Sequence, residues 1–257
     1  MTYVEVFGGG GSVLFNKERS CREVYNDINS DLINLYRCIR LRPQEMLDRL
    51  TFVLNSREEY KLAQERLNKN EYADPIDRAA DFYQVFHFSY GGKGSSYGAN
   101  FRGMWSKFPV ILEACARLQG VVIENCDFEK VIRKTDSPDT FFYLDPPYYF
   151  TEDYYPGKVF LREDHERLAE ILLCAQGYWL LSYNECPEVL SLYQKPGIYI
   201  EQMDRINNLA QKYEAGSVFS ELLISNYDTS KVQPAQLSLA DINDPIRRRN
   251  YLWPKSF

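Results

Sequence analysis

The segment YVEVFGGGGS, residues 3–12, joins a short apolar run to four consecutive glycines. The apolar run predicts a buried strand that opens directly into a glycine turn. Glycine has no Cβ and tolerates positive φ, so such a turn lets the backbone approach a ligand closely; the alternative is a tight turn without a ligand. The turn does not fit the Walker phosphate loop, which needs Gly-Lys-Ser/Thr, because Lys17 stands too far along the chain.

The stretch that follows extends this beginning into an α/β pattern. REVYNDINSDLINLYRCIR, residues 22–40, predicts a second strand, a turn at Asn26–Asn29 and a helix capped by Asn29 or Ser30. The apolar residues at helical spacing are Leu32, Leu35, Tyr36 and Ile39. Asp27 lies about 20 residues beyond the glycine turn, where an acid accepts hydrogen bonds from a ribose diol in nucleotide-binding sheets; a turn or capping aspartate is the alternative.

The chain then changes character before the α/β pattern resumes. Residues 43 to about 90 are polar and helical, and the glycine-rich loop GGKGSSYGANFRG follows at 91–103, which indicates an inserted helical subdomain. Further strands are expected at 120–124, 140–144, 178–185 and 218–227, with 198–203 beside the last, and a helix starts at 162 and ends at Gly177. The pattern predicts a doubly wound sheet interrupted by one insertion.

The polar residues of this pattern gather where the strands end. In a doubly wound sheet, ligands bind outside the carboxyl ends of the strands. The glycine turn, Asp27, Asp127 and the segment DPPY at 145–148 all follow predicted strands. The sequence therefore predicts a ligand site at this edge of the sheet.

The segment FFYLDPPYYF, residues 141–150, ends an apolar strand with a carboxylate and two prolines. Prolines offer carbonyls without N–H donors, so Asp145 and the Pro146 carbonyl form a set of acceptors. Such a set suits a planar amino group that donates two N–H bonds, and Tyr148 can stack on a base held out of a helix. The alternatives are a strand ending in a turn and a Pro-Pro-x-Tyr ligand of WW domains, which requires an exposed segment.

The length and composition of the chain limit the kinds of protein that it can be. The 257 residues suffice for one large domain or a domain with an insertion, and neither an 18-residue apolar run nor an export signal is present. Six scattered cysteines and two histidines predict no zinc site and fit a reducing cytoplasm. The net charge of −6 argues against a general nucleic-acid coat protein, but Lys93, Arg102, Lys107 and the segment RRRNYLWPK at 247–255 can meet phosphate locally.

Taken together, these motifs resemble the Dam-type adenine-specific DNA methyltransferases, particularly phage-like members. The matching segments are EVFGGGGSVLF (5–15), NDINSDLINLYR (26–37), FSYGGKGSSYG with NFRG (88–103), ENCDF (124–128) and YLDPPYY (143–149). The resemblance implies a Rossmann-like α/β sheet, mostly parallel with an antiparallel C-terminal strand. It also implies a catalytic domain over 1–42 and 108–257 and a helical target-recognition insertion over 43–107.

The resemblance further implies the reaction, the cofactor and the site residues. A methyl group would pass from S-adenosylmethionine to the exocyclic amine of a flipped adenine in double-stranded DNA, without a metal. The target adenine would be held by Asp145, Pro146, Pro147 and Tyr148. The cofactor would be held by Glu5, Phe7, Gly8, Gly9, Gly10, Gly11, Ser12, Asp27, Ile28, Asp127, Phe128 and Asp145. DNA would be bound by Lys93, Ser95, Ser96, Tyr97, Asn100, Arg102 and Lys107.

Two departures from the family pattern accompany the resemblance. Val6 stands where the family has a proline before the glycines, and only six residues precede Phe7, where relatives carry a Trp-x-Gly-Gly-Lys-like segment. Either the chain start is truncated, or a homodimer partner or second subunit supplies that segment, or the cofactor binds poorly. The alternative functions are a catalytically weak or silent DNA-binding relative, and methylation of an amine on RNA or a small molecule.

Overall fold

The strands of the protein form one mixed sheet. The computed structural model describes residues 1–92, 94–98, 103–150, 160–206 and 218–231. Its strands are β1 (Thr2–Glu5), β2 (Arg22–Asn26), β3 (Val121–Glu124), β4 (Thr140–Leu144), β5 (Tyr178–Asn184), β6 (Tyr199–Ile206) and β7 (Val218–Ser225). The strand order is β3-β2-β1-β4-β5-β7-β6. Parallel pairing joins β2 to β3 and β4 to both β1 and β5, whereas β7 runs antiparallel to β5 and β6. The predicted α/β sheet with antiparallel C-terminal pairing is confirmed.

The chain divides into two compact units. The first unit comprises Met1–Phe7, Asn16–Cys21 and Phe128–Ser256, and the second comprises Gly8–Phe15 and Arg22–Asp127. The helices of the first unit are α7 (Phe128–Thr135), α8 (Arg162–Leu173) and α9 (Pro187–Tyr193), with the 3-10 turn η4 (Thr229–Lys231). The helices of the second unit are α1 (Ser12–Asn16), α2 (Ser30–Leu41), α3 (Pro43–Thr51), α4 (Arg57–Lys69), α5 (Pro75–Phe88) and α6 (Phe108–Leu118), with the 3-10 turns η1 (Tyr90–Gly92) and η2 (Met104–Lys107).

The core of the first unit lies between its strands and helices. Alternate residues of β5, namely Trp179, Leu181 and Tyr183, are buried, as the two-residue period of a strand requires. The indole Nε1 of Trp179 donates to the carbonyl of Leu172, 2.9 Å away, which joins β5 to the buried face of α8. These contacts hold β5 against α8 within this unit.

The end of α8 differs from the expectation. The helix ends at Leu173 with Cys174 as its C-cap, four residues before Gly177. Gly177 instead precedes β5, where a Cβ would lie 2.8 Å from the carbonyl oxygen of Thr140 in β4. This glycine is therefore required by a close approach of two backbones and not by a helix end.

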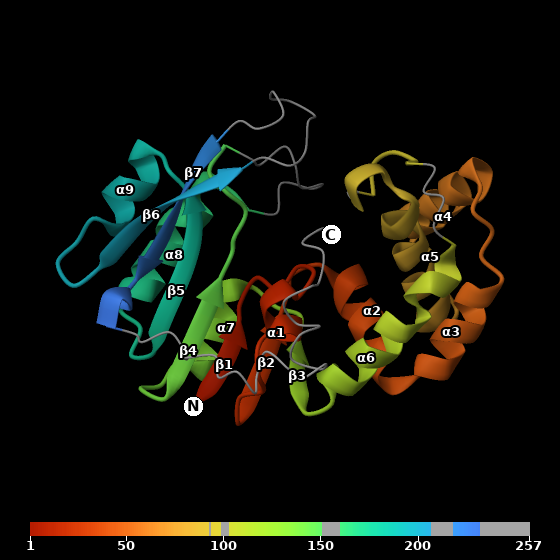
Figure 1. Ribbon diagram of the computed structural model, residues 1–257, viewed down its shortest axis with the longest axis horizontal. Coiled ribbons are helices and arrows are strands. Elements are labelled where there is room, and N and C mark those ends of the chain that lie inside the picture. The colour runs from red at the N-terminus through yellow and green to blue at the C-terminus, as the bar shows by residue number, and fades with distance from the viewer. Residues whose placement is uncertain (93, 99–102, 151–159, 207–217, 232–257) are drawn as a thin grey trace, which may run out of the picture. The chain divides into compact units, whose positions relative to one another are not determined.

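Three helices of the second unit, α2, α4 and α5, begin at residues with capping side chains. Asn29 accepts hydrogen bonds from the backbone N–H groups of Asp31 and Leu32, which confirms the predicted cap of α2. Ser56 caps α4 and Asp74 caps α5 in the same way. Helix α5 packs against α2, α3 and α4 within this unit (Figure 1).

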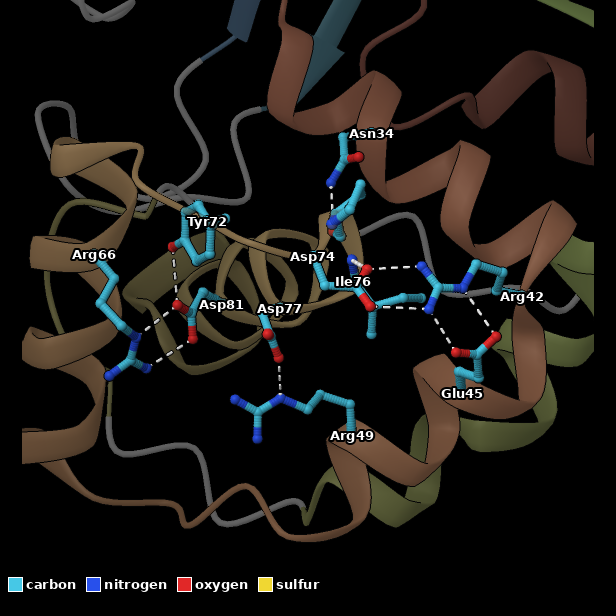
Figure 2. A network of polar contacts seen from close by, with 11 residues as sticks. Asn34, Arg42, Glu45, Arg49, Arg66, Tyr72, Asp74, Ile76, Asp77 and Asp81 are labelled. Atoms are coloured by element: carbon cyan, nitrogen blue, oxygen red, sulfur yellow. Dashed lines mark hydrogen bonds and ion pairs between the residues drawn. The ribbon is translucent and has the colours of Figure 1, made fainter.

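A network of ion pairs joins these helices (Figure 2). The guanidinium of Arg42, between α2 and α3, donates to both carboxylate oxygens of Asp74 and to both of Glu45. Arg66 of α4 forms a forked pair with Asp81 of α5 at 2.7 Å for both bonds, and the hydroxyl of Tyr72 donates to the same carboxylate. The forked geometry fixes the direction of each pair and so orients α5 against its neighbours.

Among the described residues, none of the helices has the length and apolar character needed to cross a membrane.

Candidate active site

The glycine turn after β1 depends on glycine at particular positions. A Cβ on Gly8 would lie 2.2 Å from the Tyr25 ring, and Gly11 has a φ of +67° beside the Phe15 ring. Neither position accepts a side chain without rearrangement. A Cβ on Gly9 or Gly10 would meet nothing within 4 Å, and both residues are exposed, although the φ of +48° at Gly9 also favours glycine. The middle of the turn therefore presents bare backbone with open space above it.

Asp27 is anchored to this turn. One carboxylate oxygen accepts the N–H of Gly9 at 2.8 Å, and the other accepts the N–H of Asn29 at 2.7 Å. Burial raises the pKa of Asp27, and the backbone hydrogen bonds partly offset that rise. Each oxygen retains a second lone pair, so the carboxylate can still accept hydrogen bonds from a ligand. The neighbouring Ile28 exposes 52% of its surface, which offers an apolar contact at the same place.

The segment after β3 is tied to the segment after β2. The side chain of Asn26 accepts the N–H of Cys126 and donates to its carbonyl, and Asn125 donates to the carbonyls of Asp27 and Ile28. These bonds fix the backbone that carries Asp127, which is half-buried. Gly8–Gly11, Asp27, Ile28 and Asp127 thus belong to one unit and follow the carboxyl ends of their strands.

The aromatic residues predicted for the cofactor site lie in the first unit. The rings of Phe7 and Phe128 are 5.6 Å apart, and Phe160 contacts both. The guanidinium of Arg167 lies 4.4 Å from the centre of the Phe128 ring. Phe160 and Arg167 were not predicted from the sequence, because only their packing on Phe128 distinguishes them.

Asp145 follows the carboxyl end of β4, and its side chain is exposed. The hydroxyl of Ser182 in β5 donates to Asp145 Oδ1 at 2.7 Å. Pro146 is buried and Pro147 is half-buried, so the segment presents carbonyls without adjacent N–H groups. The carboxylate is thus held by Ser182 while the residue stays exposed.

Tyr148 is half-buried, and its hydroxyl donates to Glu221 of β7 at 3.2 Å. Burial, and then the charge of Asp145, raise the pKa of Tyr148. Its hydroxyl therefore stays protonated near neutral pH and acts as a hydrogen-bond donor. The next residue, Tyr149, is buried and stacks on His165 with ring centres 4.2 Å apart. The tyrosine that a WW domain would read is thus inaccessible, which excludes that alternative.

Two further predicted residues lie near the glycine turn in the sequence. Glu5 of β1 is buried and accepts the hydroxyl of Tyr3 at 2.7 Å. Ser12 begins α1 and is exposed.

The predicted DNA-binding residues are described only in part. Lys93, Asn100 and Arg102 lie outside the described residues. Ser95 and Ser96 are exposed, whereas Tyr97 is half-buried, with its hydroxyl on Asn55 and the Arg57 guanidinium 4.9 Å from its ring centre. Lys107 ends η2 and is half-buried. The neighbouring Trp105 exposes 65% of its surface.

Three residues that contact the segment 145–149 were not predicted from the sequence: Ser182, Asn184 and Glu221. The side chain of Asn184 accepts the N–H of Tyr149 at 3.0 Å and donates to its carbonyl at 3.3 Å. Ser182 and Asn184 stand two residues apart at the end of β5, which is a signal for two polar side chains on one face. The bond of Ser182 to Asp145 and those of Asn184 to Tyr149 depend on which strand pairs with β4, which no local pattern contains.

A metal is not indicated by the described part of the chain, where no group of three or more His, Cys, Asp or Glu side chains could hold one.

Comparison with known proteins assigns the chain to a family. The profile of the D12 class N6 adenine-specific DNA methyltransferases matches residues 1–207. A type II methyltransferase of Lactococcus lactis subsp. cremoris, M1.LlaDCHI, is 27% identical over 253 residues, covering 88% of this chain and 86% of its own. The DNA N-6-adenine-methyltransferase of Escherichia phage P1 is 27% identical over 86% of this chain and 31% of its own length. The DNA adenine methylase of Escherichia coli strain K12 is 40% identical over 93 residues, which are 35% of this chain and 32% of that protein. The chain therefore belongs to the D12 class N6 adenine-specific DNA methyltransferases.

Proposed function

We propose that this protein transfers the methyl group of S-adenosylmethionine to the exocyclic amino group of an adenine flipped out of duplex DNA. The observation that best supports the proposal is the exposed carboxylate of Asp145 at the end of β4, followed by two prolines. The family match supports the reaction class. The contacts described within each unit support the role of each residue.

The residues after β1 and β2 have the properties that a nucleoside cofactor needs. The open backbone at Gly9 and Gly10 accommodates a ligand that a Cβ would obstruct. Asp27 supplies carboxylate oxygens for the ribose hydroxyls, and Asp127 and Phe128 border the adenine ring. In this proposal Glu5, Phe7, Gly8, Gly11, Ser12 and Ile28 complete the site. When bound, the cofactor supplies a methyl carbon on a cationic sulfur.

Asp145 and its neighbours would prepare the acceptor nitrogen. The nitrogen of an exocyclic amine is a poor nucleophile because its lone pair is delocalised into the ring. Asp145 Oδ and the Pro146 carbonyl accept its two hydrogens, which favours a pyramidal nitrogen with its lone pair directed outward. Tyr148 stacks on the flipped base and holds it there.

The helical insertion, residues 43–107, would contact the DNA in this proposal, and residues 1–42 and 108–257 would carry out the reaction. Exposed Ser95 and Ser96 offer hydrogen bonds to phosphate or base edges, and Lys93, Arg102 and Lys107 offer charge. Tyr97 and Asn100 belong to the same proposed surface.

The test is a methyl-transfer reaction with methyl-labelled S-adenosylmethionine. Unmethylated duplex DNA and RNA of the same base composition are offered separately, and the products are digested to nucleosides. We expect label in N6-methyladenine from DNA and none in RNA. Label only in RNA, or no transfer by a chain that binds both DNA and cofactor, would contradict the proposal.

A further inference from the structure

The segment Asp145–Tyr149, here called the acceptor loop, has few backbone donors with which to anchor itself. Pro146 and Pro147 carry no N–H group, so between Asp145 and Phe150 only the amides of Tyr148 and Tyr149 can donate. With so few backbone donors, the loop depends on side chains from elsewhere for its hydrogen bonds.

Two side chains of β5 hold the two ends of the acceptor loop. Leu144 is paired with Leu181 in the parallel ladder, so the next residues, Asp145 and Ser182, leave the ladder side by side. There the hydroxyl of Ser182 donates to Asp145 Oδ1 at 2.7 Å. Two residues further along the same face, Asn184 bonds both the N–H and the carbonyl of Tyr149.

A third contact holds the middle of the loop. Glu221 of β7 is paired with Asn184 in the antiparallel ladder and accepts the hydroxyl of Tyr148 at 3.2 Å. The beginning, middle and end of the acceptor loop are thus each fixed by a polar side chain of β5 or β7.

We propose that Ser182 and Asn184 are positioning residues for methyl transfer: Ser182 orients the carboxylate of Asp145, and Asn184 fixes the backbone that presents Tyr148. This inference rests on the function proposed above. In this proposal each residue acts through the loop and not on the reacting nitrogen itself. Displacing a catalytic group by about 1 Å costs on the order of 100-fold in rate. Side chains that hold the acceptor loop in place therefore affect the rate of the reaction.

The chain provides matched controls for both residues. Asn226 makes the same pair of backbone bonds at the opposite end of β5, accepting from Trp179 N at 3.0 Å and donating to the carbonyl of Gly177 at 2.9 Å. Ser225 is a buried serine of β7 whose hydroxyl donates to the carbonyl of Tyr227. Losses of stability common to each pair cancel when Asn184→Ala is compared with Asn226→Ala, and Ser182→Ala with Ser225→Ala.

The first measurement does not depend on activity. Hydrogen exchange of the Tyr149 amide is followed by mass spectrometry in the wild type, Asn184→Ala and Asn226→Ala. Because the bond from this amide to Asn184 contributes about 1 kcal/mol, we expect exchange to accelerate about fivefold in Asn184→Ala and to stay unchanged in Asn226→Ala. Unchanged exchange in Asn184→Ala would overturn the role of Asn184, whether or not the protein methylates DNA.

The second measurement is the turnover rate on unmethylated plasmid DNA at saturating S-adenosylmethionine. We expect Ser182→Ala and Asn184→Ala to lower kcat by roughly 10- to 100-fold relative to their matched controls. The dissociation constant of the cofactor should stay within about twofold of the wild-type value, and Ser182→Thr, which keeps the hydroxyl, should recover most of the rate. A kcat equal to that of the controls would overturn the proposal. An inactive wild type would refute the proposed function, and the exchange measurement would then decide whether Asn184 holds the acceptor loop.

Discussion

Gly10 separates the role of the glycine turn in folding from its role in binding. A Cβ at Gly10 meets no atom within 4 Å, whereas a Cβ at Gly8 lies 2.2 Å from the Tyr25 ring. We expect Gly10→Ala to change the free energy of unfolding by less than about 0.5 kcal/mol and Gly8→Ala to cost about 1–3 kcal/mol. Thermal unfolding of both variants checks this difference.

Calorimetry on Gly10→Ala then tests the cofactor site. The added methyl group occupies the open side of the turn, so the affinity for S-adenosylmethionine should fall although the protein stays folded. Wild-type affinity in this variant would mean that the cofactor does not approach Gly10.

Tyr148 combines a ring, proposed to stack on the flipped adenine, with a hydroxyl that donates to Glu221. Stacking on a base contributes about 1–3 kcal/mol, so Tyr148→Ala should lower kcat/KM for DNA by a corresponding factor. Tyr148→Phe keeps the ring and, because Ser182 and Asn184 still hold the loop, should lose less activity than Tyr148→Ala. Equal losses in the two variants would show that the hydroxyl, and not the stacking ring, is what matters.

At the scale of elements, the start of α5 depends on charge. Asp74 caps the helix and pairs with Arg42, and these hydrogen bonds lower its pKa from 3.8 to about 2. A carboxyl group whose pKa is lower in the folded than in the unfolded chain stabilises the fold at pH values above its unfolded pKa. This stabilisation is lost as the pH falls through the folded pKa of about 2.

Asp74→Asn keeps a capping side chain but removes the charge. We expect this variant to unfold at a lower temperature than the wild type at pH 7, with the difference shrinking between about pH 4 and pH 2. Thermal unfolding monitored by circular dichroism across this range measures it. A difference that does not depend on pH would contradict the charge pair.

Strands and capped helices were predictable because their signals are local. The run TFFYL coincides with β4, and Asn29 caps α2 as its place before an apolar helical pattern indicates. Gly177 was assigned to a helix end because a glycine after a helical pattern commonly has that role. Its actual constraint is the backbone of β4, which lies 37 residues earlier at Thr140 and leaves no trace in the neighbouring sequence.

The same distinction holds for the candidate site. Gly8–Gly11, Asp27, Asp127 and Asp145 each follow a strand directly, so a rule about strand ends finds them. Ser182 and Glu221 reach Asp145 and Tyr148 only through the pairing of β4, β5 and β7. Such pairing depends on the whole fold, and therefore these partners could not be predicted.

At the scale of the whole molecule, a protein of net charge −6 must bind a polyanion through local positive charge. We expect the triple variant Lys93→Ala, Arg102→Ala, Lys107→Ala to bind DNA with a weaker salt dependence. Each lost phosphate contact lowers the slope of log K against log salt by about 0.9. Fluorescence anisotropy with labelled duplex DNA between low and physiological salt gives this slope.

The control carries the same change of charge on another element. Lys130, Arg133 and Lys134 are exposed residues of α7, and replacing all three with alanine should leave the slope unchanged. Equal slopes in both triple variants would contradict the assignment of DNA binding to the insertion.

The most direct test of the account is the single-turnover rate of methyl transfer to DNA by Asp145→Ala, measured beside cofactor binding by calorimetry. We predict that transfer falls below detection, because the amine loses its acceptor, while S-adenosylmethionine binds nearly as tightly as to the wild type. Wild-type turnover by Asp145→Ala would contradict the central claim that this carboxylate prepares the adenine nitrogen for methylation.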